Sequence, residues 1–228
     1  MTLRLDSPAR VFEVAKTAKN KTLKNFVPQE ELESLERQIF AWGSKHKGHF
    51  GELVEKYVFG LAKNNRSEAD FFEAKVELKT TPLRRHSTKK FVAKERLVFS
   101  MIDYDAIINE RWDTSTFLQK NRMILIMFYL FELGQGLLDY EFKIVKLLDL
   151  LDDLSVQDVE QIRKDWQFIV DKIGRGQAHL LSEGDTFYLG ACTKAANSRV
   201  VRDQPKARIP AKPRAFSLKQ SYLTYLIQ

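Results

Sequence analysis

The decapeptide Asp70–Lys79 reads DFFEAKVELK, in which Glu77 lies seven positions after Asp70 and Lys79 lies two positions after Glu77. Apolar residues alternate with Glu77 and Lys79, which is typical of a β-strand. Side chains at i and i+2 of a strand lie on one face, so Glu77 and Lys79 are predicted to point to the same side. Asp70, across a predicted hairpin, would add a second carboxylate there.

Two carboxylates and a lysine in this arrangement suit the hydrolysis of a phosphodiester bond. Carboxylate oxygens are the ligands that Mg2+ prefers, so Asp70 and Glu77 are candidate metal ligands. Lys79 would bind a phosphate oxygen and position or deprotonate the attacking water. The alternative is an exposed edge strand in which Glu and Lys alternate for solubility. Acid-x-Lys triplets also occur at Glu73 and Glu141, so the triplet alone decides nothing.

The rest of the chain predicts an α/β (α+β) protein with a mixed β-sheet flanked by helices. Helical spacing predicts helices at residues 9–18, 29–42, 50–61 and 156–173. Clusters of β-branched and aromatic residues predict strands at 74–81, 91–102, 122–131, 141–147, 186–189 and 215–218. No internal repeat and no Gly/Ser-rich linker divides the chain.

Composition excludes several classes of protein. With 228 residues, 44% of them apolar and 29% charged, the chain can form a core and is not a disordered tail. Its longest apolar run, Met123–Phe131, is about half the length that a bilayer crossing requires, and no signal segment is visible, so we expect a cytoplasmic protein without membrane contact. The single cysteine, Cys192, excludes an internal disulfide and a zinc cluster.

The net charge of +7 is concentrated at one end of the chain. Residues 190–228 contain eight basic side chains and one acidic side chain, which leaves 29 basic and 29 acidic residues in the rest. A basic segment beside a neutral body is the electrostatic pattern of a protein that binds polyanions, because neutralised phosphates release their counterions. Nucleic acid is therefore the first partner to consider, with a solvated basic tail as the alternative.

Five separated blocks resemble the MutH family, which comprises the mismatch-repair endonuclease MutH and related type II restriction endonucleases that cut GATC. The blocks are KGHFGELVE at 47–55, Asp70, VELKTTP at 76–82, CTKAAN at 192–197 and PRAFSLK at 213–219. They occur in the family's order, and a lysine before the strand at 122–131 resembles the family's central lysine. The similarity covers roughly residues 45–225, and nothing diagnostic precedes it.

The resemblance implies a restriction-endonuclease-like fold with an active site that binds Mg2+. The catalytic positions that it implies are Asp70, Glu77, Lys79, Glu55 and Lys120. Asp70 and Glu77 would bind the metal, while Glu55 matches a helix carboxylate and Lys120 a further lysine near the site. Glu52 competes with Glu55 for its role. Without the resemblance, Glu55 is equally well interpreted as a solvated helix position and Lys120 as a loop lysine.

The same resemblance implies a set of DNA-contact positions. They are Lys47, Lys194, Arg214, Ser217 and Lys219. Lys47 precedes a helix N-terminus, which attracts phosphate, and the other basic residues suit either phosphate clamping or guanine contacts. Ser217 stands where the mismatch-repair enzyme has a tyrosine placed to sense the adenine amino group.

We therefore expect one endonuclease domain over residues 1–228, with a helical N-terminal layer (1–45), a catalytic core (46–150) and a C-terminal helix and DNA-recognition region (151–228). The expected activity is Mg2+-dependent, type II restriction-like hydrolysis of double-stranded DNA at GATC, insensitive to adenine methylation. The segments 90–99, 182–184 and 192–205 favour restriction over repair. The alternatives are a MutH-like enzyme that nicks unmethylated GATC with a MutL-like partner, and a non-catalytic DNA-binding effector domain. Some restriction relatives contain a second copy of the fold, so a homodimer or a second MutH-like domain is expected on DNA.

Overall fold

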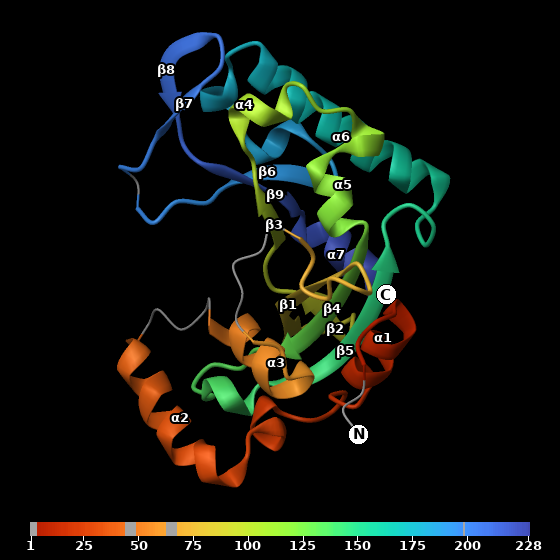
Figure 1. The fold of residues 1–228 in the computed structure, drawn as a ribbon, viewed down its shortest axis with the longest axis vertical. Helices are drawn as coiled ribbons and strands as arrows, with labels where there is room; N and C mark the ends of the chain where they lie inside the picture. Colours follow the sequence, from red (N-terminus) through yellow and green to blue (C-terminus); the bar gives the residue numbers. More distant parts are fainter. Residues whose placement is uncertain (1–3, 44–48, 63–67, 198) are drawn as a thin grey trace. The chain divides into compact units, whose positions relative to one another are not determined.

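The computed structural model describes residues 4–43, 49–62, 68–197 and 199–228 and divides the chain into two compact units (Figure 1). The first unit consists of Met1–Lys94 and Met123–Leu148, and the second of Glu95–Arg122 and Asp149–Gln228. The chain changes from one unit to the other after Lys94, after Arg122 and after Leu148. The last of these points is close to the predicted boundary at residue 150, whereas the other two fall inside the predicted catalytic core. The single endonuclease domain stays a prediction. Lys47 lies outside the described residues.

The first unit is built on a four-stranded mixed sheet with strand order β2-β1-β4-β5. Its strands are β1 (Val76–Arg85), β2 (Phe91–Ala93), β4 (Met123–Leu130) and β5 (Glu141–Asp149). β1 is antiparallel to β2 and parallel to β4. The apolar run that begins at Met123 is β4, buried along almost its whole length, as expected for an inner strand with a parallel neighbour. The interpretation of Glu77 and Lys79 as part of an exposed strand is wrong, because Glu77 is only 2% exposed. This part of β1 is paired with β4 and not with β2, which pairs with β1 only at Leu83–Arg85.

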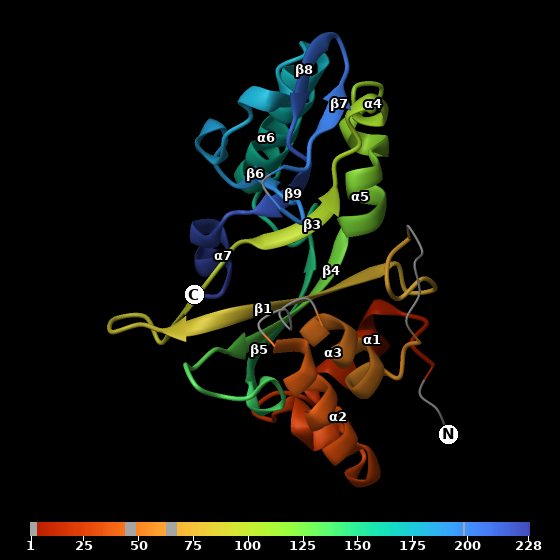
Figure 2. The same cartoon turned by 90° about the vertical axis from the view of Figure 1, so that its left-hand side faces the viewer.

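The helices of the first unit lie on one side of this sheet (Figure 2). They are α1 (Pro8–Lys16), α2 (Gln29–Trp42) and α3 (His49–Phe59), with short helical turns η1 (Leu23–Phe26) and η4 (Leu137–Asp139). α3 packs on β1 and α1 packs on β4. The core between the layers includes Phe50, Val54 and Met127, all with at most 1% of their surface exposed. The three predicted N-terminal helices are thus confirmed.

The second unit has a three-stranded antiparallel sheet in the order β3-β9-β6. Its strands are β3 (Leu97–Met101), β6 (Leu189–Thr193) and β9 (Arg214–Leu218), and β7 (Arg202–Gln204) and β8 (Ala207–Ala211) form a separate two-stranded ribbon. Its helices are α4 (Tyr104–Ile107), α5 (Thr116–Asn121), α6 (Val156–Gly174) and α7 (Gln220–Leu226), with turns η3 (Trp112–Thr114), η5 (Ala178–Leu180) and η6 (Glu183–Asp185). A chain of aromatic contacts links Trp166, Trp112, Phe117 and Phe216 in its core.

The strand predicted at 91–102 is two strands that belong to different units. The N–H of Lys94 still bonds to the carbonyl of Pro82 in the first unit, at 2.8 Å, whereas Leu97 pairs with Leu218 in the second. The prediction was wrong because local alternation indicates a strand and not its partners.

The strand predicted at 186–189 is also wrong, because β6 begins only at Leu189. The buried carboxylate of Asp165 on α6 accepts the N–H groups of Phe187, Tyr188 and Leu189 at 2.6–3.0 Å. A backbone whose donors are bonded to a side chain cannot form a sheet ladder with the same groups.

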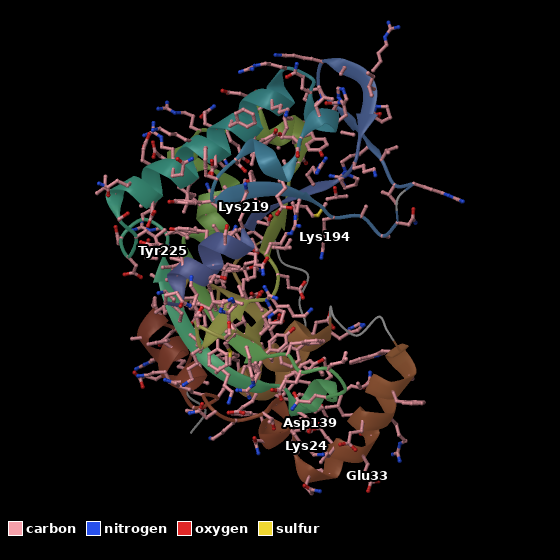
Figure 3. All side chains as sticks on the ribbon, turned by 180° about the vertical axis from the view of Figure 1, so that it is seen from behind. Lys24, Glu33, Asp139, Lys194, Lys219 and Tyr225 are labelled. Atoms are coloured by element: carbon pink, nitrogen blue, oxygen red, sulfur yellow. The ribbon has the colours of Figure 1, made fainter. Side chains whose placement is uncertain are left out.

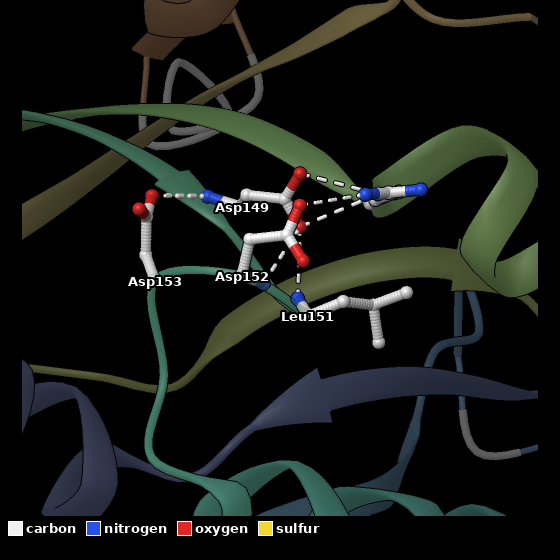
Figure 4. A network of polar contacts seen from close by, with 5 residues as sticks. Asp149, Leu151, Asp152 and Asp153 are labelled. Atoms are coloured by element: carbon white, nitrogen blue, oxygen red, sulfur yellow. Dashed lines mark hydrogen bonds and ion pairs between the residues drawn. The ribbon is translucent and has the colours of Figure 1, made fainter.

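Arg122 does not begin the following strand, as predicted, but ends α5. Its guanidinium bonds to Asp149 at 3.1 Å and to Asp152 at 2.9 Å (Figure 4). The Asp149 carboxylate also accepts the N–H of Leu151 at 2.8 Å, and Asp153 accepts the N–H of Asp149 at 2.7 Å. These contacts hold the turn after β5 in a fixed conformation.

Candidate functional site

The predicted Glu–Lys pair lies on β1, beside β4 in the first unit's sheet. Lys79 Nζ is 2.5 Å from Glu77 Oε1, and the two side chains are 20% and 3% exposed. An ionised carboxylate in such a buried position requires a charged or hydrogen-bonding partner, which Lys79 provides. The predicted common face of Glu77 and Lys79 is therefore confirmed.

Asp70 is brought to the start of β1 by the predicted hairpin. Phe71 and Val76 form an isolated antiparallel bridge, and Lys75 in the turn has a positive φ of 53°. β2 pairs only with the far end of β1, so it does not reach the backbone of Leu78. The N–H of Leu78 instead donates to Asp70 Oδ2 at 2.9 Å, which fixes the Asp70 carboxylate beside the residue that follows Glu77.

Glu55 on α3 belongs to the same electrostatic group. The pKa of its carboxyl is raised to about 7, first by burial and next by the negative charge of Asp70. The charges of Glu52 and Glu77 act in the same direction, and that of Lys79 acts against them. Gly51 of α3 faces Thr80 of β1, where an added Cβ would lie 3.7 Å from the threonine hydroxyl, an ordinary contact.

Glu52, the competitor for the role of Glu55, is oriented differently. Its carboxylate contacts His49 Nδ1 at 3.3 Å, and its side chain is 42% exposed. Glu52 and Glu55 are both half-buried, but the pKa of Glu55 responds to the charges of Asp70, Glu77 and Lys79. The structure thus brings Glu55, Asp70, Glu77 and Lys79 together in the first unit.

The residues that could hold a metal ion here are Asp70 and Glu77. Within the described residues, no group of three or more His, Cys, Asp and Glu side chains is arranged as a complete metal site. Mg2+ does not require one, because it is usually bound by one or two carboxylates and completes its shell with water and phosphate oxygens. The oxygen donors of Asp70 and Glu77 fit this hard cation.

We expect the metal-free protein to lose stability as the pH rises. Glu55 has a raised pKa in the folded state, so the folded protein binds its proton more tightly than the unfolded chain does. The stability that this proton contributes is fully present below the ordinary pKa of 4.5 and is lost as the pH rises through about 7. Thermal unfolding midpoints measured in a chelator between about pH 5 and pH 8 should therefore fall for the wild type and fall less for Glu55→Gln. Glu33→Gln is the control, because the Glu33 side chain is 87% exposed on α2 and its charge is not among those that act on Glu55, so this variant should keep the wild-type decline. A Glu55→Gln profile as steep as that of the wild type would contradict the assignment.

The remaining predicted site residues lie in the second unit. Lys120 is in the last turn of α5, so it is a helical lysine rather than a loop lysine. Lys194 follows β6 and is exposed, and its backbone N–H bonds to the carbonyl of Pro213 at 2.9 Å (Figure 3).

Two of the predicted DNA-contact residues bind backbone carbonyls of their own unit. The Arg214 guanidinium donates to the carbonyl oxygens of Ala191 at 3.2 Å and Leu181 at 2.5 Å. Lys219 Nζ donates to the carbonyl of Thr186 (Figure 3). In this conformation both side chains connect β9 to the segments around β6.

Ser217 has no exposed surface in this structure. It lies in the central strand β9, opposite Val98 on β3 and Gly190 on β6. The neighbouring aromatic residues are also buried, with Phe216 packed 5.0 Å from Phe117 and Tyr222 stacked 4.1 Å from Tyr188, between ring centroids. The predicted DNA contact of Ser217 stays a prediction.

A cavity of about 600 Å3 lies in the second unit, and no sequence pattern had predicted it. Its lining residues are Glu95, Arg96, Val98, Glu183, Ala191, Cys192, Thr193, Lys194 and Arg214. An ion pair between Arg96 and Glu183, at 2.7 Å, forms part of the wall. These residues come from four distant segments. The segments 90–99, 182–184 and 192–205 and the residue Arg214 had been singled out separately, but the sequence did not indicate that they meet around one cavity. Among the described residues, no helix is long and apolar enough to cross a membrane.

A family model for the DNA mismatch repair enzyme MutH matches residues 59–165. The type II restriction enzyme Sau3AI of Staphylococcus aureus is 41% identical over 182 residues, which cover 80% of this chain and 37% of that enzyme. The DNA mismatch repair protein MutH of Shigella flexneri is 28% identical over 189 residues, covering 80% of this chain and 77% of that protein. MutH of Escherichia coli K12 shows the same identity and coverage.

The chain thus spans little more than a third of the restriction enzyme but most of the repair proteins. Both kinds of relative are named for enzymes that act on DNA, and the mixed sheet with its flanking helices fits the predicted restriction-endonuclease-like fold. The chain is similar to the MutH family over residues 59–165, and its sequence identity to the staphylococcal restriction enzyme is higher than its identity to these repair proteins.

Proposed function

We propose that this chain is a Mg2+-dependent endonuclease of the restriction type that cuts both strands of double-stranded DNA at GATC, whether or not the adenine is methylated. The observation that carries the proposal is the group formed by Asp70, Glu77 and Lys79 at β1 in a chain 41% identical to a type II restriction enzyme. Retention of all three side chains in one place argues against a non-catalytic DNA-binding domain.

In this proposal the first unit performs the chemistry. The carboxylates of Asp70 and Glu77 would hold Mg2+, which when bound would supply Lewis-acid stabilisation of the charge that develops on the scissile phosphate. The Lys79 ammonium, held by Glu77 in the structure, would donate to a non-bridging phosphate oxygen and orient the attacking water. Glu55, with a pKa of about 7, is suited to accept or hold a proton near neutral pH.

The second unit would supply DNA contacts. The exposed Lys194 is the basic residue of the predicted set that is best placed to reach a phosphate or a base edge. Arg214 and Lys219 would act through the backbone carbonyls that they bind, by positioning the segments next to Lys194. Lys120 and Lys47 remain proposed contributors on the strength of the family resemblance.

One observation favours the repair-type alternative, a nicking enzyme activated by a MutL-like partner. The chain covers 77% of the length of the repair proteins, compared with 37% of the restriction enzyme. For the restriction reading, cleavage of two strands requires two active sites, so we propose that a second copy of the chain or a second MutH-like domain acts on the same duplex.

The test is incubation of the purified chain with plasmid DNA and Mg2+, followed by mapping of the ends. We expect linear products whose ends all lie at GATC, with a rate of double-strand cleavage that rises more than linearly with protein concentration. Products restricted to single nicks that require a MutL-like protein would instead establish the repair function. Binding to GATC duplexes without cleavage under any divalent cation would contradict the endonuclease proposal.

A further inference from the structure

The β7–β8 ribbon of the second unit pairs with neither of the two larger sheets. Its strands are antiparallel, with Arg202 opposite Ala211 and Gln204 opposite Ala207, and Lys206 in the turn has a positive φ of 58°. An isolated two-stranded ribbon is marginally stable in water, so its conformation must be supported by contacts with the rest of the unit.

The side chain of Gln204 provides most of this support. It is 6% exposed, and its Oε1 accepts the N–H of Ala178 at 2.7 Å. Its Nε2 donates to the carbonyl of Ile209 across the ribbon at 2.5 Å and lies 2.9 Å from His179 Nδ1. One buried amide therefore joins both strands of the ribbon to η5.

The two ends of the ribbon are also held. At the turn, the chain passes so close to Gly176 that an added Cβ would lie 2.9 Å from the carbonyl oxygen of Lys206. Gly176 also has a positive φ of 73°, so this position favours glycine on both grounds. After β8, the carbonyl of Lys212 accepts the hydroxyl of Tyr104 at 2.6 Å.

The exposed side of this fixed ribbon is strongly basic. Its exposed basic residues, with those of the flanking segments, are Arg199, Arg202, Lys206, Arg208 and Lys212. Asp203 is the one acidic residue between positions 199 and 212. Within the described part of the chain, none of the five basic side chains has a carboxylate at ion-pair distance, whereas Arg163, Lys164 and Arg175 on and next to α6 lie 3.6–3.9 Å from acidic side chains.

We propose that the β7–β8 ribbon is a site for the phosphate backbone of double-stranded DNA, which holds the duplex without reading its sequence. The proposal deepens the proposed function and rests on it. Positive charges that have no carboxylate at ion-pair distance within the described residues are suited to an external polyanion. The one amide on the ribbon, Gln204, is committed to the protein's own backbone, and the exposed polar side chains of the ribbon and its turn are Arg202, Asp203, Lys206 and Arg208, so contact with the phosphate backbone fits better than base recognition.

The test compares two triple variants with the same change in charge. In the ribbon variant, Arg202→Ala, Lys206→Ala and Arg208→Ala are combined. In the control, Arg163→Ala, Lys164→Ala and Arg175→Ala are combined on and next to α6 of the same unit. All six side chains are exposed, so both variants should fold, which circular dichroism and thermal midpoints would verify. Kd is measured for a GATC duplex and a scrambled duplex over a range of KCl concentrations.

The ribbon variant should lose affinity for both duplexes by the same factor, at least about tenfold, and the slope of log affinity against log salt should become shallower by about 2.7. The control should stay close to the wild type. A ribbon variant that behaves like the control, while the wild type binds and cuts GATC DNA, would overturn the ribbon site and leave the proposed function intact. A loss confined to the GATC duplex would also overturn it, because the ribbon would then read bases. A wild-type chain that binds neither duplex would overturn the proposed function and the ribbon site together.

Discussion

Glu77→Gln and Lys79→Met should each lower the rate of DNA cleavage by at least about 100-fold while leaving the affinity for GATC DNA largely unchanged. Glutamine keeps the shape of the buried Glu77 side chain but removes the negative charge that Lys79 and a divalent cation require. Methionine at position 79 keeps an unbranched side chain and removes the ammonium. Glu77→Gln therefore tests the charge, whereas Lys79→Met also leaves the buried Glu77 carboxylate without this partner, so its folding must be verified by circular dichroism and a thermal midpoint.

The chain contains a matched control for this prediction. Glu141 and Lys143 form a second Glu-x-Lys ion pair on β5 of the same sheet. Single-turnover cleavage, measured at saturating Mg2+ with Kd determined separately in Ca2+, should leave Glu141→Gln at the wild-type rate. Wild-type cleavage by either β1 variant, or an equal loss in Glu141→Gln, would show that the active site lies elsewhere.

A fully adenine-methylated plasmid should be cut at GATC at the same rate as an unmethylated one. The N6 group of adenine lies in the major groove, where a side chain must reach it to detect a methyl group. In the motif PRAFSLK, Ser217 is short and fully buried, and the nearby Phe216 and Tyr222 are 2% and 3% exposed. None of these three side chains is at the surface of the unit, where it could detect the added methyl group.

Parallel digests of unmethylated, hemimethylated and fully methylated plasmids would measure this effect. A plasmid without GATC serves as the control for non-specific cleavage. A repair-type enzyme would be blocked by full methylation and would nick only the unmethylated strand of the hemimethylated plasmid. Strong inhibition by full methylation would therefore contradict the restriction proposal while leaving the catalytic assignment of Glu77 and Lys79 open to its own test.

Features that depend on local periodicity were predictable from the sequence. α2 and α6 begin at the predicted residues Gln29 and Val156, because a regular apolar stripe determines where a helix can pack. The common face of Glu77 and Lys79 follows from the two-residue period of any strand. These properties need no knowledge of distant parts of the chain.

Features that depend on a distant partner were not predictable. The alternation at 91–102 is genuine, but only the fold assigns Phe91–Ala93 to one sheet and Leu97–Met101 to another. Asp165 binds the backbone donors of a segment more than 20 residues away, which no local pattern reveals. In the candidate site, the sequence identified Glu55, but its raised pKa arises from the packing of α3 on β1.

The same limit applies to the basic residues of the C-terminal segment. Their positive charge predicted that the segment binds DNA, and Arg214 and Lys219 contribute to that charge. The sequence could not indicate that their side chains donate to carbonyl groups 23 to 33 residues away. A positively charged residue that stabilises its own backbone has the same composition signature as one that faces a phosphate.

The position of β1 also determines how the candidate site responds to heat. Glu77 and Lys79 lie opposite Ile124 and Ile126 of β4, in a ladder with fully buried residues on the partner strand. Amide hydrogens in such a ladder exchange with solvent only when the sheet itself opens. Fraying of loops or helix ends therefore does not disassemble the carboxylate–lysine pair, and irreversible loss of cleavage on heating should coincide with cooperative melting of the first unit.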